Sequence, residues 1–150
     1  KKEPKGSSFA YSIIFTHFFD PAFAHDLYGS FRENFYTSLL GVDFAKEWED
    51  GRSEMDLDSG PVIAGAGTVS SAFAMGAAKL SEDPYHFKSL SLSAELVTAP
   101  AHTFGKKQYA LNLSLGESVL LFCRTLRPWV GQPSTSSSQN VDATPSGRYE

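Results

Sequence analysis

The chain has 150 residues, which is enough for one domain with a core, because a chain of about this size buries roughly 70% of the surface that it exposes when unfolded. Hydrophobic residues make up 41% of it and charged residues 20%, as in ordinary globular proteins. The formal net charge of -4 gives no basic surface for a phosphate backbone and argues against nucleic acid as a partner.

The two ends of the chain differ from its middle. Residues 1–8 are expected to form a flexible amino-terminal segment; they lack the layout of a signal peptide and begin with lysine, which suggests a fragment or a processed chain. Residues 131–150 are rich in Ser, Thr, Pro and Gly, with Val141 as their one aliphatic residue. Such a segment buries too little surface to offset its ordering entropy, so we expect a disordered tail. The folded domain is then residues 9–130.

Two helices are expected in the first third of the domain. Residues 9–19 are apolar with almost no alternation, which predicts a buried helix. A second helix should begin at Asp20-Pro21, since aspartate caps free amides and proline suits the first helical position. We expect it to span residues 21–40 and to stop at Gly41. Its apolar residues recur every four positions, at Phe23, Leu27, Phe31, Phe35 and Leu39.

The middle of the chain combines an acidic loop with a segment of small residues. A short segment, residues 42–48, leads into the loop, which has five acidic residues. Pro61 fits another first helical position, and residues 62–80 predict a helix rich in Gly, Ala and Ser. Because each Gly costs a helix roughly 1 kcal/mol relative to Ala, this helix needs close neighbours and should be central.

The last third predicts two more helices. Asp83-Pro84 repeats the earlier helix start, so we favour a helix to about residue 97, although the alternating Ser and Leu residues also suit a strand. Residues 100–105 predict a loop, and residues 108–115 are ambiguous between helix and strand. Residues 117–126 predict a short helix that buries Cys123, the only cysteine, which excludes an intrachain disulfide and a cysteine-cluster zinc site. The predicted fold class is all-α, built from antiparallel helical hairpins.

The segment from Val62 to Ser70 partly matches a dinucleotide-binding glycine loop. The third glycine position holds Ser70, and no strand ending in an acidic residue follows at the required distance, so we do not expect nucleotide binding. Residues 61–78 also carry no formal charge, which raises the alternative of a transmembrane helix. Their many small residues favour a packed helix in water instead.

Two carboxylates in the acidic loop are the candidates for catalysis. If Asp56 and Asp58 face one cleft, their repulsion raises one pKa and separates a proton donor from an ionised base, as in glycoside hydrolysis. The alternative is a solvated loop in which Asp58 or Ser59 caps the next helix.

Candidates for substrate binding are an aromatic residue and two histidines. Trp48 lies next to the acidic loop and offers a face on which a sugar or terpenoid can stack. His17 is near Asp20, His25 and Asp26, but a helix break at Asp20-Pro21 leaves their geometry open, so we expect no metal site and no cofactor. His102 lies in the loop predicted at residues 100–105.

The runs His17–Ala24 and Asp56–Ile63, followed by Gly76-Ala-Ala78, resemble the carboxyl-terminal part of α/α-toroid proteins. The six-hairpin glycosidases and the linalool dehydratase-isomerase type of bacterial membrane-linked protein share that architecture. The resemblance covers about residues 15–130 and implies a partial α/α toroid with its substrate cleft at residues 56–61. A complete six-hairpin barrel has twelve helices, whereas this chain has room for about five, so it implies only part of a barrel wall.

Two functions of different class follow. The first is a fragment of an α/α-toroid enzyme acting on a carbohydrate or other small organic substrate through Asp56 and Asp58. The second is a noncatalytic helical assembly domain, or the soluble part of a membrane-anchored bacterial protein, with an exposed apolar face. Expected partners are a small-molecule substrate, missing hairpins of a parent chain, or a second copy; contact with a membrane is expected only through an anchor of the parent.

Overall fold

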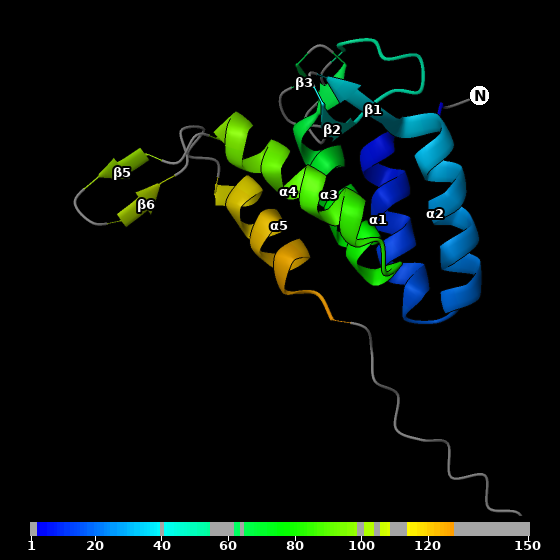
Figure 1. Ribbon diagram of the computed structural model, residues 1–150. Coiled ribbons are helices and arrows are strands. Elements are labelled where there is room, and N and C mark those ends of the chain that lie inside the picture. The colour runs from blue at the N-terminus through cyan, green and yellow to red at the C-terminus, as the bar shows by residue number, and fades with distance from the viewer. Residues whose placement is uncertain are drawn as a thin grey trace, which may run out of the picture.

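The structure of the chain, a computed structural model, describes residues 3–39, 41–54, 62–63, 65–98, 101–103, 106–108 and 114–127. Within those ranges it contains five helices and three two-stranded antiparallel hairpins, and it is mostly helical, as predicted (Figure 1). The predicted tail, residues 131–150, lies outside the described residues.

The first two helices are α1 (Gly6–His17) and α2 (Pro21–Phe35), which pack side by side (Figure 1). The predicted helix start is confirmed: the backbone N–H of Phe23 donates to Asp20 Oδ1 at 3.0 Å, and Pro21 occupies the first helical position. Helix α1 begins three residues earlier than the expected domain boundary, and Ser7, expected in a flexible segment, is buried.

The expected helix over residues 21–40 is wrong at its carboxyl end. Residues Tyr36–Leu39 form strand β1, which pairs with β2 (Val42–Ala45) in the register Tyr36 with Ala45 and Leu39 with Val42. The carbonyl of Phe35 accepts a bond from Lys46 N at 2.8 Å, so the pairing starts where the helix stops. Gly41 does have a positive φ of 79°, but it serves a hairpin turn and not a helix end.

The helix expected over residues 62–80 starts later. Strands β3 (Val62–Ile63) and β4 (Ala66–Gly67) form a short hairpin, and helix α3 runs from Thr68 to Leu80. Gly65 turns this hairpin with a φ of 82°, and a Cβ there would lie 2.4 Å from the Gly51 carbonyl oxygen. Of the two glycines that resemble a nucleotide loop, Gly65 therefore makes a tight turn against a neighbouring loop, whereas Gly67 precedes α3 and faces Glu47 and Ser70.

Helix α3 is the centre of the bundle, as its small residues predicted. It packs against α1, α4 (Pro84–Thr98) and α5 (Ser114–Thr125), and most of its residues are buried. At Gly76 a Cβ would lie 2.9 Å from Ile14 Cδ1 and 3.0 Å from Cys123 Sγ. Close packing at this crossing offsets the low helix propensity of the small residues.

The choice between helix and strand at residues 88–97 is resolved as helix α4. Its alternating serines do not mark a strand, because they face two different neighbours. Ser89 Oγ accepts from Asp43 N at 3.1 Å and Ser93 Oγ donates to the Asp43 carbonyl, whereas Ser91 Oγ lies 3.2 Å from Met75 Sδ of α3.

The predicted loop over residues 100–105 contains strand β5 (Ala101–Thr103), which pairs with β6 (Lys106–Gln108) in a hairpin apart from the bundle (Figure 1). Of the ambiguous residues 108–115, Gln108 ends β6, while 114 and 115 begin α5. Cys123 of α5 is fully buried, as predicted, and burial raises the pKa of its thiol to about 12.

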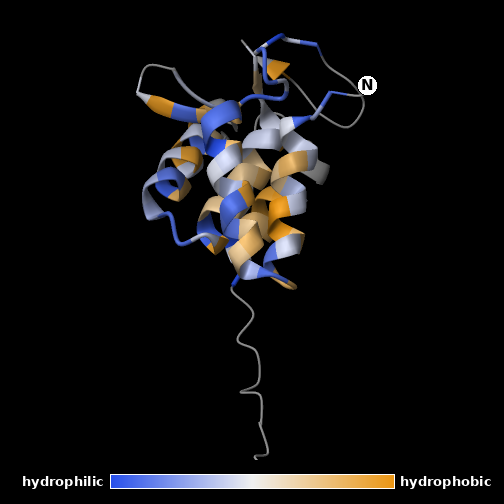
Figure 2. Ribbon diagram, turned by 90° about the vertical axis from the view of Figure 1, so that its right-hand side faces the viewer, coloured by the Kyte–Doolittle hydropathy of each residue, from blue (hydrophilic) through white to orange (hydrophobic). Residues whose placement is uncertain are grey.

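Hydrophobic residues gather along the helices, whereas the loops above them are hydrophilic (Figure 2). The buried core joins Ile13 and Ile14 of α1, Phe31 and Phe35 of α2, and Met75 of α3. In the part of the chain that the structure describes, no helix combines the length and apolar content needed to cross a lipid bilayer.

The contact at Gly6 predicts a sharp difference between two glycine substitutions. A Cβ at Gly6 would lie 2.0 Å from the Lys46 carbonyl oxygen, so we expect Gly6→Ala to lower the free energy of unfolding by about 1–3 kcal/mol. Gly29, exposed on α2, has nothing within 4 Å of its Cβ position, and Gly29→Ala should instead raise it by up to about 1 kcal/mol. Urea unfolding of both variants measures the difference; equal effects would contradict the close approach of α1 to residue 46.

Candidate functional site

Asp56 and Asp58, the predicted catalytic residues, lie outside the described residues. The three predicted binding residues, Trp48, His17 and His102, lie in different parts of the fold. The backbone of Trp48 pairs with that of Lys5 in an isolated β-bridge just before α1 begins, whereas His17 is in the last turn of that helix. Twelve helical residues separate those ends by about 18 Å. His102 lies in β5, opposite Lys107 of the distant hairpin.

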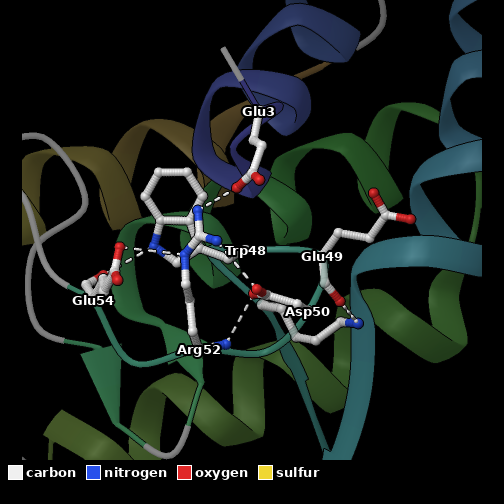
Figure 3. Close-up of polar contacts among 7 residues, drawn as sticks. Glu3, Trp48, Glu49, Asp50, Arg52 and Glu54 are labelled. Atoms are coloured by element: carbon white, nitrogen blue, oxygen red, sulfur yellow. Dashed lines mark hydrogen bonds and ion pairs between the residues drawn. The ribbon is translucent and has the colours of Figure 1, made fainter. Parts of the chain in front are cut away.

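Trp48 lies in a cluster of charged side chains (Figure 3). The Arg52 guanidinium is 4.3 Å from the centroid of the Trp48 ring, and Lys5 Nζ is 5.3 Å from it. The indole N–H donates to the Glu54 carbonyl at 2.9 Å. Cations over an aromatic face are attracted by its quadrupole, so a substrate would have to displace Arg52 to stack on that face.

Three carboxylates hold Arg52 in place (Figure 3). Its guanidinium pairs with Glu3, with Asp50 at 3.1 Å and with Glu54 at 3.3 Å. The hydrogen bond to Glu3 is the main cause that raises the pKa of Arg52. A shallow depression of about 390 Å³ beside this cluster is lined by Glu3, Pro4, Glu49 and Asp50. The predicted aromatic platform is thus part of an ion-paired surface.

A buried carboxylate, Glu47, lies one residue before Trp48. Glu47 is fully buried, and both of its oxygens accept serine hydroxyls, from Ser7 at 2.8 Å and from Ser70. Ser7 is in the first turn of α1 and Ser70 is in the first turn of α3. Neither helix has a side-chain cap of its own at Lys5 or Gly67. The carboxylate therefore places negative charge where two helix dipoles favour it.

The backbone around Glu47 completes this junction. Gly6 N donates to the Glu47 carbonyl at 2.8 Å, and Glu47 N donates to the Gly65 carbonyl at 3.3 Å. A Cβ at Gly67 would lie 3.1 Å from Glu47 Oε2, so glycine leaves the room that the carboxylate fills. With both oxygens occupied, Glu47 acts as a structural link between two helices and not as a free base.

A second polar cluster surrounds Asp83, in the turn between α3 and α4. Asp83 Oδ2 accepts the Tyr28 hydroxyl at 3.1 Å and lies 2.8 Å from His86 Nδ1. His86 N donates to Asp83 Oδ1 at 3.1 Å, which caps α4. The Arg32 guanidinium approaches Asp83 Oδ2 to 3.5 Å. One carboxylate thus joins α2 to the start of α4.

Burial by itself would raise the pKa of Asp83, but the hydrogen bonds from His86 and Tyr28 outweigh it and hold this pKa below its usual value. Burial also raises the pKa values of Tyr28 and Tyr36, so both phenols are neutral. Tyr36 Oη and Asp43 Oδ2 are buried and make no hydrogen bond within the described ranges. The Tyr36 ring lies edge-on to His86, with centroids 4.7 Å apart.

Sequence reasoning missed both carboxylate clusters. Asp83 was read as a helix start, which is correct, but its bond to Tyr28 spans 55 positions. Glu47 was read as part of an ordinary short segment, and its partners are 40 and 23 positions away. The one signal available was a lone acidic residue between the apolar residues Ala45 and Trp48. Among the described residues, no group of three or more His, Cys, Asp or Glu side chains is placed to hold a metal ion.

Comparison of the chain with models of protein families, with curated proteins and with solved structures finds no match.

The two bonds to Glu47 predict a large effect of truncation. Glu47→Ala leaves two buried serine hydroxyls unpaired and a cavity, and should lower the free energy of unfolding by about 2–4 kcal/mol. Glu47→Gln keeps the shape of the side chain; its amide oxygen can accept one serine hydroxyl and its amide nitrogen can donate to the other. This variant should therefore lower the free energy of unfolding by less than Glu47→Ala. Exposed Glu49 is the matched control, and a Glu47→Ala variant as stable in urea as Glu49→Ala would contradict the linking role.

The depressed pKa of Asp83 predicts acid sensitivity. Because this pKa is lower in the folded than in the unfolded chain, its stabilisation is complete above the unfolded value near 4 and is lost as the pH falls through the folded value. Asp83→Asn keeps a cap but removes the charge, so its stability should depend less on pH below 4 than that of the parent chain.

Asp83→Ala should lower the free energy of unfolding by about 1–2 kcal/mol at neutral pH. Asp20→Ala, which removes a cap without further partners, serves as the comparison. Thermal unfolding between pH 2 and pH 7 measures these differences. An identical acid slope in the parent chain and in Asp83→Asn would refute the role given to this carboxylate.

Proposed function

We propose that this chain is a noncatalytic helical domain that assembles with another protein surface through an aromatic row along α1 and the turn after it. The row consists of Tyr11 and Phe15 of α1 and of Phe19, which lies in the turn that follows the helix. Their exposed fractions are 47%, 40% and 88%, and this exposure is the single observation that carries the proposal.

Two members of the aromatic row, Tyr11 and Phe15, are held in position before any partner arrives. The rings of Tyr11 and Phe15 have centroids 4.4 Å apart, and Tyr11 meets the Phe73 ring of α3 edge-on at 5.4 Å. Side chains that are already ordered lose little rotamer entropy on association. Exposed aromatic residues are enriched at protein interfaces and dominate their energetics. These features support a binding surface over an incidental exposure.

The polar clusters support the noncatalytic class. Glu47 uses both oxygens on serines, and Asp83 is used in capping and in bonds to α2. Arg52 lies over the Trp48 ring that a sugar would need. Chemistry through Asp56 and Asp58 in a partial α/α toroid stays a prediction, since both carboxylates lie outside the described residues.

The proposal is tested by removing the row without touching the core. In cell extract, the full chain should elute in a complex larger than the monomer, and Tyr11→Ser with Phe15→Ser should shift it toward the monomer. Leu92→Ser with Leu96→Ser, on the exposed face of α4, is the matched control for lost apolar surface. An unchanged elution volume for the Tyr11 and Phe15 variant would contradict the proposal.

A further inference from the structure

Two buried polar atoms of the β1–β2 hairpin have no hydrogen-bond partner among the residues that the structure describes. They are the phenol oxygen of Tyr36 and the carboxylate oxygen Oδ2 of Asp43. Asp43 as a whole is only 9% exposed. Nearly all buried polar groups in folded proteins bond to protein or to ordered water, so each unpartnered atom calls for a physical explanation.

The strand register places both side chains on one face of the hairpin. Tyr36 of β1 pairs with Ala45 of β2. Asp43 lies two positions before Ala45 on the same strand, and side chains two positions apart on a strand share a face. Tyr36 and Asp43 are therefore diagonal neighbours across the two strands. Such neighbours are separated by on the order of 7–8 Å, which is within reach of an aromatic side chain.

Helix α4 contacts both residues on neighbouring turns. The Tyr36 ring lies edge-on to His86, with centroids 4.7 Å apart. Ser89, three residues further along α4, accepts from Asp43 N at 3.1 Å. Three helical residues advance by only about 4.5 Å along the axis. The contacts with α4 thus agree with the strand register in placing Tyr36 and Asp43 close together.

The two unpartnered atoms have complementary hydrogen-bonding character. Burial is the main cause that raises the pKa of Tyr36, and the charges of Asp83 and Asp43 add to it. The phenol is therefore neutral and has a proton to donate, whereas an ionised carboxylate can only accept. A group that satisfies both atoms has to accept one hydrogen bond and donate another, and a single water molecule does both.

Other ligands suit these two atoms less well. A metal ion in a protein is held by several charged or lone-pair donors, but here one carboxylate oxygen faces a neutral phenol that carries a proton. A larger organic molecule would have to separate α4 from the hairpin, because both atoms are shielded from solvent. Buried waters typically bond to polar groups that lack other partners, as these two do.

We infer that one ordered water molecule binds between Tyr36 Oη and Asp43 Oδ2, where it accepts a hydrogen bond from the phenol and donates one to the carboxylate. This water links strand β1 to strand β2 beneath α4. The inference concerns the interior of the hairpin and is independent of the assembly proposed for the aromatic row.

Oxygen-17 magnetic relaxation dispersion of the full chain tests the inference, because it counts water molecules that stay bound for longer than the protein takes to tumble. Tyr36→Phe combined with Asp43→Val makes the site apolar, and apolar cavities of this kind stay dry. We expect this variant to hold about one long-lived water fewer than the parent chain. Replacing both polar partners together leaves neither stranded, so the variant should still fold.

A matched control removes the same kinds of group from the surface. Tyr85 and Asp26 are both exposed, so Tyr85→Phe with Asp26→Ala should leave the number of long-lived waters unchanged. Equal numbers in the parent chain and in the Tyr36 and Asp43 variant would overturn the inference.

Thermal unfolding of the single and double variants gives a second measurement. Tyr36→Phe and Asp43→Val each leave the water with one partner fewer, whereas the double variant no longer binds it. The lowering of Tm in the double variant should therefore be smaller than the sum of the two single shifts. Additive shifts would show that no water joins the two side chains.

Discussion

The fold depends on one buried carboxylate. Glu47 is fully excluded from solvent, and a carboxylate in such a place costs several kcal/mol unless hydrogen bonds replace its water. Its two bonds come from Ser7 and Ser70, at the starts of α1 and α3. The bundle therefore has to hold these two helix ends on either side of Glu47, which fixes the register of α1 against the central helix. Gly6 and Gly67 follow from the same constraint, because each lies where a Cβ would meet residue 46 or 47.

Asp83 plays a comparable part at the other end of α3. A helix of thirteen residues places the two carboxylates about 20 Å apart, one at each end of the central helix. Where Glu47 joins α1 to α3, Asp83 joins α2 to the start of α4 through Tyr28 and His86. The carboxylates of Glu47 and Asp83 are thus both engaged in holding helices together. The exposed face of α1, by contrast, carries aromatic rings and no Asp, Glu, Lys or Arg. It therefore offers no charge that would select an oppositely charged partner.

Local signals in the sequence identified much of the helical framework. Asp20 caps α2, Asp83 caps α4, and the run of small residues does form the packed central helix. These features depend on neighbours within four positions, which a sequence displays directly. The hairpins at residues 36–45, 62–67 and 101–108 were missed, because strands of two to four residues are shorter than any periodic pattern. Trp48 was singled out as a platform, but the pairing of Arg52 with Glu3, 49 positions away, decides its surroundings.

The sequence by itself determined where α2 and α4 begin, that α3 is central, and that Cys123 is buried, since caps, small residues and apolar runs act locally. Only the tertiary structure decided which polar residues are structural and which apolar residues stay exposed. Glu47 resembles any loop carboxylate until Ser7 and Ser70 converge on it, and Phe15 resembles any core residue until Ile13 and Ile14 take the buried side of α1. The reason is physical: burial and pairing depend on contacts between residues far apart in the chain, and no local pattern encodes them.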